Sequence, residues 1–169
     1  ALASAWVLPL QARPAAVMQG VPNATLRGQG DLRFWGFKVY TAKLWTQSTF
    51  EANRWLQHPL ALEIEYARAF SGLSIAEKSL DEMRLGGELT NPTAARWLAA
   101  MTTAFPDVAA GSRLTAVWSA ARGHTTFFAN DAQRTVVAEP AFGERFFGIW
   151  LAPHSSAPTL RPALLSTAP

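Results

Sequence analysis

Residues Arg27–Trp45 read RGQGDLRFWGFKVYTAKLW, and this stretch carries the strongest signal for the fold class. Its opening Gly-x-Gly, Gly28 and Gly30, also occurs in turns that bind nucleotide phosphates. Such a turn needs a third glycine and a helix whose N-terminus faces the phosphates, but here aromatic and β-branched residues continue without any helix signal. The segment 24–47 is therefore predicted to be strand, with its glycines giving room for bends.

A second strand is predicted from the alternation in LALEIEYARAF, residues 60–70. Apolar side chains occupy every second position, whereas Glu63 and Glu65 fall between them, which is typical of a half-buried strand with one face in water. Arg68 shares the apolar face by parity, close to the end of the strand. Its guanidinium is expected either to reach back to the rim of that face or to point at a ligand.

Two helices are predicted to follow. The first begins at Ser74, where Glu77 completes a capping box, and it ends before Gly86. The second begins at Asn91, with Pro92 at its first helical position. Its Trp and Met residues recur at helical spacing, and we interpret that stripe as packing against a sheet rather than as a cofactor site.

Three further strands are predicted in the second half of the chain, RLTAVWSA, HTTFFAN and RTVVAE, joined by turns into an antiparallel meander. The last two apolar segments, PAFGERFFGIWLA and PTLRPALL, are predicted to be helical. This order of elements indicates an α+β domain of two layers, in which helices cover one face of an antiparallel sheet. We assign residues 21–169 to this domain and residues 1–20 to an N-terminal arm or the remnant of a signal peptide.

The composition favours a well-buried interior and excludes several kinds of site. Hydrophobic residues make up 49% of the 169-residue chain and charged residues 16%, which argues against disorder. The net charge is +3, but the 15 basic residues stand singly, without the basic run expected of a nucleic-acid partner. Cysteine is absent, which excludes disulfides, thiolate metal sites and cysteine nucleophiles.

The first residues, ALASAWVLPLQARPAA, are apolar and rich in small side chains. Ala-x-Ala at Ala3–Ala5 resembles a signal-peptidase cleavage site, so we expect a periplasmic or secreted protein. An ordinary hydrophobic arm is the alternative. No apolar run in the sequence approaches the roughly 20 residues of a membrane span, so no integral membrane segment is expected.

The sequence contains no recognisable metal site or acid–base couple. His58, His124 and His154 are far apart and none has a metal-binding spacing, so neither a metal nor another cofactor is expected. Asp81–Glu82 is predicted to lie on a solvated helix face, which does not suit a buried acid–base pair.

Arg33 and Tyr40 remain as candidates for a ligand-binding site. An arginine fork and a tyrosine hydroxyl on a sheet that faces helices can hold an anionic or carbonyl-bearing head group. Alternatively, Arg33 pairs with a carboxylate such as Glu63, and Tyr40 packs in the core. The residues alone leave these two interpretations open.

Five blocks of the sequence, in order between Leu26 and Leu165, resemble the bacterial chalcone isomerase-like proteins, a branch of the chalcone isomerase superfamily. They are GQGDLRFWGFKVYTAKLW, LEIEYARAFSGLSIAEKSLDEM, FPDVAAGSRLTAVW, TTFFAN and PAFGERFFGIWLAPHSSAPTLRPALL. The resemblance implies an open-faced β-sandwich, a large antiparallel sheet with a layer of helices on one side and a ligand cleft between them.

For function, the resemblance implies two alternatives. Plant members close a flavanone ring with an arginine, two threonines, a tyrosine and an asparagine. Arg33 matches that arginine, but Tyr40 and Ile149 stand at the threonine positions, which argues against ring closure. Non-catalytic members hold a fatty-acid carboxylate with an arginine and a tyrosine, and Arg33 and Tyr40 resemble that pair.

We therefore expect a non-catalytic protein that binds a small amphiphilic or fatty-acid-like ligand in the cleft between sheet and helices. The alternative is an isomerase or lyase that acts on an enone or phenolic, chalcone-like substrate.

Overall fold

The structure is a computed structural model that describes residues 12–166. Within this range the chain forms a six-stranded antiparallel sheet whose strands follow their order in the sequence. The strands are β1 (Thr25–Phe34), β2 (Phe37–Thr46), β3 (Leu60–Tyr66), β4 (Arg113–Ser119), β5 (His124–Ala129) and β6 (Ala132–Val137). The predicted order of strands along the chain is confirmed.

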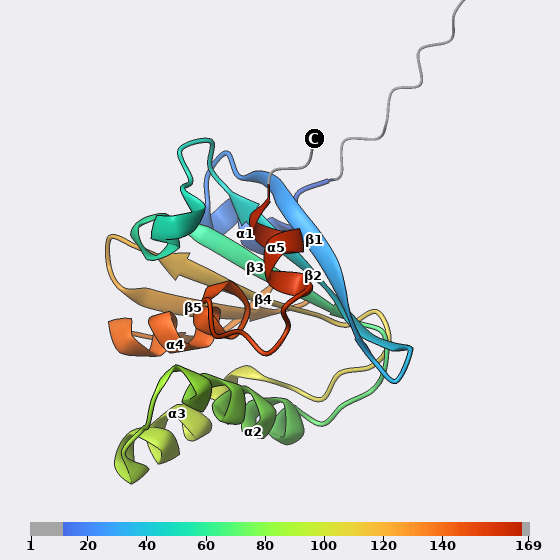
Figure 1. The fold of residues 1–169 in the computed structure, drawn as a ribbon, viewed down its shortest axis with the longest axis vertical. Helices are drawn as coiled ribbons and strands as arrows, with labels where there is room; N and C mark the ends of the chain where they lie inside the picture. Colours follow the sequence, from blue (N-terminus) through green and yellow to red (C-terminus); the bar gives the residue numbers. More distant parts are fainter. Residues whose placement is uncertain (1–11, 167–169) are drawn as a thin grey trace, which may run out of the picture.

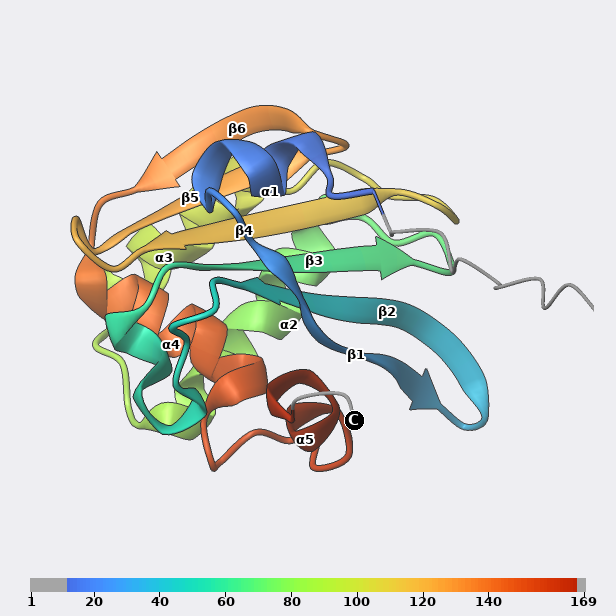
Figure 2. The same ribbon diagram turned by 90° about the horizontal axis from the view of Figure 1, so that it is seen from above.

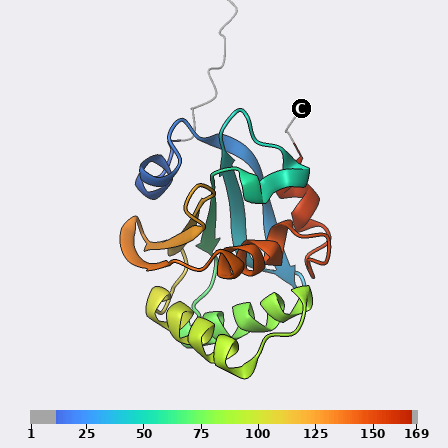
Figure 3. The ribbon, with the colours of Figure 1, turned by 90° about the vertical axis from the view of Figure 1, so that its left-hand side faces the viewer.

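Helices connect the strands and cover the sheet (Figure 1). They are α1 (Ala15–Gly20), η1 (Ala52–Gln57), α2 (Gly72–Met83), η2 (Arg84–Gly86), α3 (Asn91–Ala104), α4 (Pro140–Leu151) and α5 (Leu160–Leu165). α4 packs on the sheet, and the α2–α3 pair lies on the same side of it (Figures 1 and 3), where α3 also contacts β5 and β6. Apart from α1, the helices gather on one face of a large antiparallel sheet, which confirms the predicted α+β class and open-faced β-sandwich. None of the helices in the described range is long and apolar enough to cross a bilayer.

A hydrophobic core fills the space between the helical layer and the sheet. Alternate residues of β3 point into it, as their spacing predicts, and α4 contributes the largest share of aromatic rings. Gly143 lets α4 approach the sheet, because a Cβ there would lie 2.2 Å from the indole ring of Trp118. The core residues of these two elements are Leu60, Leu62, Ile64 and Tyr66 of β3, and Phe142, Phe146, Phe147, Ile149, Trp150 and Leu151 of α4.

Gly28 and Gly30 bring β1 into close contact with α5. A Cβ at Gly28 would lie 2.2 Å from the carbonyl oxygen of Ala163, and one at Gly30 would lie 2.7 Å from a methyl group of Leu160. The register of β1 also shifts after Leu26, next to the first glycine. The Gly-x-Gly pattern thus serves helix packing, in addition to the strand irregularity predicted for it.

The opposite face of the sheet is partly covered by α1 (Figure 2). A second, smaller cluster of buried side chains joins α1 to that face: Ala16, Val17, Val21, Ala24, Trp45, Ala61, Val117 and Phe128. Residues 12–20, the described part of the predicted N-terminal arm, therefore include a helix packed on the sheet. Ala3–Ala5, the predicted cleavage motif, lies outside the described residues.

The N-terminal segment that lies on this face of the sheet changes the environment of β3. Glu65 is exposed, as the alternation predicts, but Glu63 is only 2% exposed. The segment Ala12–Pro14 and the side chains of Lys43 and Arg113 surround its carboxylate. The prediction that this whole face of β3 lies in water is therefore wrong at Glu63.

The first predicted helix begins earlier than expected. Ser71 is the N-cap of α2, because its hydroxyl accepts a hydrogen bond from the backbone N–H of Ser74 at 3.1 Å. The predicted capping box of Ser74 and Glu77 is therefore wrong. The second predicted helix, α3, does begin at Asn91.

Candidate functional site

A cavity of about 670 Å³ opens between the sheet and the helical layer. Its volume lies within the range of about 300–1,000 Å³ that is usual for small-molecule sites. Side chains of β1, β2 and β3 form one wall, and those of α2 and α4 form another. The apolar part of the lining consists of Leu32, Phe34, Val39, Leu62, Ile64, Phe70, Ile75, Phe105, Leu114, Ala116, Phe127, Phe146, Ile149, Trp150 and Ala157.

Aromatic rings give this lining a defined shape. Phe146 lies at their centre, with its ring centroid 5.0 Å from that of Phe127 and 5.4 Å from that of Trp150, both in edge-to-face geometry. Such contacts stabilise a ring pair beyond the burial of its area, by about 0.5–1.5 kcal/mol. The interior therefore suits an alkyl chain or an aryl group, and it disfavours an unpaired charge.

Tyr40 places a polar group in this apolar surrounding. Its hydroxyl oxygen accepts a hydrogen bond of 2.9 Å from the indole N–H of Trp150, which reaches it from α4. Among residues 12–166, no acceptor is found for the proton of Tyr40 itself. Burial raises the pKa of Tyr40 to about 12, although the bond from Trp150 opposes that shift. Tyr40 is therefore a neutral phenol at physiological pH, with one donor available to a ligand.

Tyr66 lies beside Tyr40 on the neighbouring strand. The two residues are register partners of β2 and β3, and their ring centroids are 5.9 Å apart. Burial also raises the pKa of Tyr66. Its hydroxyl makes no hydrogen bond within the described part of the chain. The cavity wall thus carries two phenol groups that stay protonated at physiological pH.

Arg33 lines the same cavity but lies at its mouth. Its side chain is 58% exposed, its guanidinium donates to the carbonyl oxygen of Gly36 at 3.3 Å, and it lies 3.6 Å from the carboxylate of Asp31. The pairing of β1 with β2 shifts register between Leu32 and Arg33. The structure brings Arg33 and Tyr40 to one cavity without a hydrogen bond between them. The carboxylate beside Arg33 is Asp31, and not Glu63 as the alternative interpretation had it.

Arg68 is a second guanidinium at the mouth. It is exposed and lines the cavity, and its guanidinium carbon lies 5.5 Å from the centre of the Phe37 ring. No carboxylate of residues 12–166 lies within 4.0 Å of it. Of the two placements expected for Arg68, the rim is therefore the one observed, and its charge is free to meet an anion there.

Glu82 also lines the cavity, so the prediction that Asp81–Glu82 lies on a solvated face is wrong for its second residue. The Glu82 side chain is 15% exposed and accepts hydrogen bonds from Lys78, at 2.9 Å, and from Ser156. Burial acts to raise the pKa of Glu82, but these two donors outweigh it and hold the pKa below its usual value. Glu82 is an anion already paired with its neighbours, not a free acid or base.

Trp150 and Tyr66 are polar members of the site that sequence reasoning missed. The alternation of β3 placed Tyr66 on the core face, but only the register of β2 against β3 shows that it adjoins Tyr40. The spacing of α4 predicted Trp150 as an apolar residue, which it also is, since it is only 7% exposed. The signal that could have found it is its indole N–H, a donor that needs a partner when it is buried.

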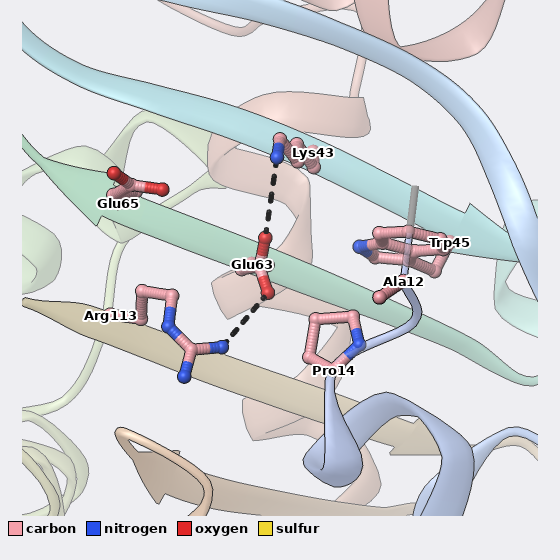
Figure 4. Close-up of a pocket in the computed structure, with 7 residues that line it drawn as sticks. All are labelled: Ala12, Pro14, Lys43, Trp45, Glu63, Glu65 and Arg113. Carbon is pink, nitrogen blue, oxygen red and sulfur yellow. Dashed lines mark ion pairs between the residues drawn. The ribbon is translucent and has the colours of Figure 1, made fainter. Parts of the chain in front are cut away.

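A second, smaller cavity of about 370 Å³ lies on the opposite face of the sheet (Figure 4). Glu63 occupies its floor between Lys43, at 4.0 Å, and Arg113, at 3.6 Å. Both distances are too long for direct hydrogen bonds, and one carboxylate oxygen of Glu63 has no hydrogen-bond partner among residues 12–166. Burial raises the pKa of Glu63, and the two cations offset that shift only in part. This smaller cavity is open and has charged residues in its lining, whereas the lining of the 670 Å³ cavity is mostly apolar.

Neither cavity contains a metal site. Within residues 12–166, no three His, Cys, Asp or Glu side chains are grouped so that they could hold a metal ion. His58, one of the three histidines, instead lies 3.6 Å from the carboxylate of Glu51, outside both cavities.

Comparison with known proteins adds three findings. Residues 12–166 match the sequence model of a family described as chalcone isomerase-like. An uncharacterised protein of Haemophilus influenzae is 30% identical over 163 residues, which cover 95% of this chain and 74% of that protein. The crystal structure of the Arabidopsis thaliana fatty-acid binding protein AtFAP1 superposes with a TM-score of 0.64, over 85% of this chain and 87% of that one, at 8% identity. At that identity, the likeness to AtFAP1 concerns the fold alone.

Proposed function

The chain belongs to the chalcone isomerase-like family, and from that premise we propose that it is a non-catalytic binding protein for a fatty acid or a similar amphiphile. The hydrocarbon part of the ligand occupies the 670 Å³ cavity between sheet and helices. Its carboxylate faces the mouth, so that Tyr40 donates a hydrogen bond to it from inside the cavity, and Arg33 and Arg68 supply positive charge from the rim.

The observation that carries this proposal is the hydroxyl of Tyr40. Its oxygen already accepts the bond from Trp150, so its rotation is limited and its own proton is left for a ligand inside an apolar cavity. Hydrogen bonds to a charged acceptor are shorter and roughly twice as strong as neutral ones. A carboxylate at this point gains that bond while its alkyl chain leaves water.

Two further facts support the proposal. A structure that shares this fold, AtFAP1, is a fatty-acid binding protein by its description. The mouth also carries more basic than acidic side chains: Arg33, Arg68 and Lys78 line it, with Glu82 as the anion among the lining residues. Because Glu82 is paired with Lys78, an incoming carboxylate meets the guanidinium groups and not a free acid.

Titration with dodecanoate and with dodecanol, followed by calorimetry, tests the proposal. The two ligands share one alkyl chain, so a preference for dodecanoate measures recognition of the carboxylate. Arg33→Ala is expected to weaken dodecanoate binding by about threefold to tenfold, since the guanidinium is half exposed and screened, and to leave dodecanol binding unchanged. Arg122→Ala, at an exposed residue of the β4–β5 turn, serves as the matched control. Failure of both ligands to bind would refute the proposal.

An isomerase or lyase is the competing function, with Tyr40 as the acid and Arg33 as the stabiliser of developing negative charge. The same protein incubated with chalcones and related enones distinguishes the two. Turnover that Tyr40→Phe abolishes would replace the binding proposal by the enzymatic one.

Export to the periplasm or the medium is proposed on the sequence of residues 3–5 alone. Fractionation of cells that express the complete gene, with the N-terminal residue of the product determined, tests this. Recovery of the protein in the cytoplasm only would contradict it.

A further inference from the structure

The turn between β1 and β2 exposes three large aromatic side chains. Phe34, Trp35 and Phe37 are 69%, 84% and 65% exposed. The hairpin carries them beyond the neighbouring strand β3, at the end of the sheet from which the chain enters α2 (Figures 1 and 2). Isolated exposed apolar residues are ordinary, but a group of three rings at one tip is typical of an interaction surface.

The backbone conformation adds to this observation. Trp35 and Gly36 have φ values of +51° and +78°. In hairpin turns with two successive positive φ values, the usual sequence at these two positions is Asn-Gly. A bulky aromatic side chain is disfavoured in this left-handed region. The Trp35 ring makes an edge-to-face contact with Phe34, with 6.1 Å between centroids, and is otherwise in solvent. Packing within the described residues therefore does not account for a tryptophan at this position.

Positive charge surrounds the rings. Arg33 and Lys38 flank the turn, and Arg68 lies over Phe37 from the β3–α2 loop. Asp31 lies 3.6 Å from Arg33 and 3.5 Å from Lys38, and exposed Glu65 stands in the same row of the sheet, since both carboxylate residues pair with Thr41. The basic residues stand singly in the sequence, but the fold gathers three of them here, Arg33, Lys38 and Arg68, against the two carboxylates of Asp31 and Glu65.

Aromatic rings combined with lysine and arginine characterise segments that lie at the boundary between lipid head groups and acyl chains. The rings enter the boundary, while the cations stay among anionic head groups. A protein partner would need an acidic pocket shaped for three rings, whereas a fluid lipid surface accepts them without such a fit.

The tip of the hairpin lies next to the mouth of the large cavity. Arg33 and Phe34 of the hairpin and Arg68 beside it are also lining residues of the large cavity. A membrane in contact with the tip therefore adjoins the cavity mouth. An amphiphile could then pass between bilayer and cavity without crossing bulk water.

We propose that residues 33–38, together with Arg68, form a docking site for bilayer surfaces that contain anionic lipid. Phe34, Trp35 and Phe37 insert at the level of the head groups, and the cations contact the lipid phosphates. Docking itself does not depend on the function proposed above; ligand exchange with the membrane does rest on it.

Co-sedimentation of the full chain with vesicles tests the docking. We expect binding to vesicles of phosphatidylcholine and phosphatidylglycerol, weaker binding to phosphatidylcholine alone, and a decrease with salt. Trp35→Asn is the informative variant, because Asn-Gly is the preferred sequence for this turn and the fold keeps or gains stability. This variant is expected to reduce the partition coefficient about tenfold or more.

Leu85→Ser is the matched control, since Leu85 is 52% exposed but belongs to η2, at the other end of α2. It is expected to bind vesicles like the unaltered protein. The proposal is overturned if the unaltered protein does not bind the anionic vesicles, if Trp35→Asn binds them equally well, or if sedimentation without lipid shows that Trp35 mediates self-association. Tyr40→Phe should leave vesicle binding unchanged, and Trp35→Asn should leave dodecanoate affinity in lipid-free solution unchanged, so failure of one proposal is distinguishable from failure of the other.

Discussion

The indole N–H of Trp150 donates to the hydroxyl oxygen of Tyr40 at 2.9 Å, across 110 positions of the sequence. This bond joins α4 to β2 and therefore connects the two layers that enclose the large cavity. Because Tyr40 acts as the acceptor, its own proton is left for another acceptor, such as a ligand. The same contact thus stabilises the fold and defines the direction of the donor that we propose for ligand binding.

Replacement of Tyr40 by phenylalanine removes that donor and is expected to weaken dodecanoate binding. A hydrogen bond to a charged group contributes about 1.5–3 kcal/mol, which corresponds to roughly a tenfold to hundredfold loss of affinity. The variant also leaves the Trp150 N–H without its acceptor, so the free energy of unfolding should fall by about 1–3 kcal/mol. Calorimetry and chemical denaturation measure the two effects separately. Tyr66→Phe is the control in the same wall, and an equal or larger loss of affinity there would assign the head group to Tyr66 instead.

Replacement of Gly28 by alanine tests the packing of α5 on β1. The new Cβ would lie 2.2 Å from the carbonyl oxygen of Ala163 and 2.6 Å from that of Leu164, so the backbone of α5 must move. We expect the free energy of unfolding to fall by about 1–3 kcal/mol. Gly148→Ala is a matched control, because the nearest atom to its Cβ is 3.5 Å away and alanine favours a helix. A Gly28 variant as stable as the control would show that the glycine is not needed for this contact.

Replacement of Glu63 by glutamine is expected to change how stability depends on pH. Burial raises the pKa of Glu63 in the folded protein above the usual value of 4.5, which applies in the unfolded chain. As pH rises past 4.5, the unfolded chain therefore loses this proton while the folded protein still holds it. The unaltered protein therefore loses stability as pH rises through this window, whereas the glutamine side chain of the variant does not titrate. The free energy of unfolding of Glu63→Gln should therefore increase, relative to that of the unaltered protein, as pH rises.

Denaturation at a series of pH values measures this difference, with Glu65→Gln as the exposed control on the same strand. Arg113 keeps its partner Asp131 at 2.7 Å in the variant, which limits the loss of pairing. A variant that becomes less stable than the unaltered protein as pH rises would mean that the ion pairs of Glu63 outweigh its burial.

Glu139 should show the opposite pH dependence. Hydrogen bonds from Arg96, at 2.6 and 3.0 Å, and from Trp97, at 3.0 Å, lower the pKa of Glu139 to about 2. Its stabilising effect is therefore present above the usual pKa of 4.5 and is lost as pH falls through that value towards 2. Because Glu139 is 37% exposed, solvent screens the pair, and Glu139→Gln is expected to cost about 1 kcal/mol or less at neutral pH. Thermal unfolding of Glu139→Gln and Glu144→Gln at neutral and acidic pH checks this, and a loss in Glu139→Gln that persists in acid would contradict it.

Much of the fold follows from local patterns that the sequence displays. Alternation placed Leu60, Leu62 and Ile64 on the core face of β3, and Pro92 indicated the start of α3, because these signals depend on the period of one element alone. The cap at Ser71 was missed because serines at positions 71 and 74 both satisfy the local rule, and only the path of the chain into α2 distinguishes them.

The candidate site was less predictable, since its features depend on segments far apart in the sequence. Tyr40 was identified, but its partner Trp150 comes from α4. Glu82 was predicted to lie on a solvated helix face, whereas in the fold it lines the cavity and accepts a hydrogen bond from Ser156, which belongs to the segment after α4.

The order of strands and helices, the core face of β3 and membership of the family all follow from the amino-acid sequence alone, since periodicity and motif content are properties of the chain. Three other features required the three-dimensional fold: Glu63 is buried, Gly28 makes room for a helix, and Arg33 lies at the rim while Tyr40 lies inside. Each of these features depends on which segments pack against each other. The burial of a side chain, and the free energy that goes with it, follows from this tertiary packing and not from the residue type alone.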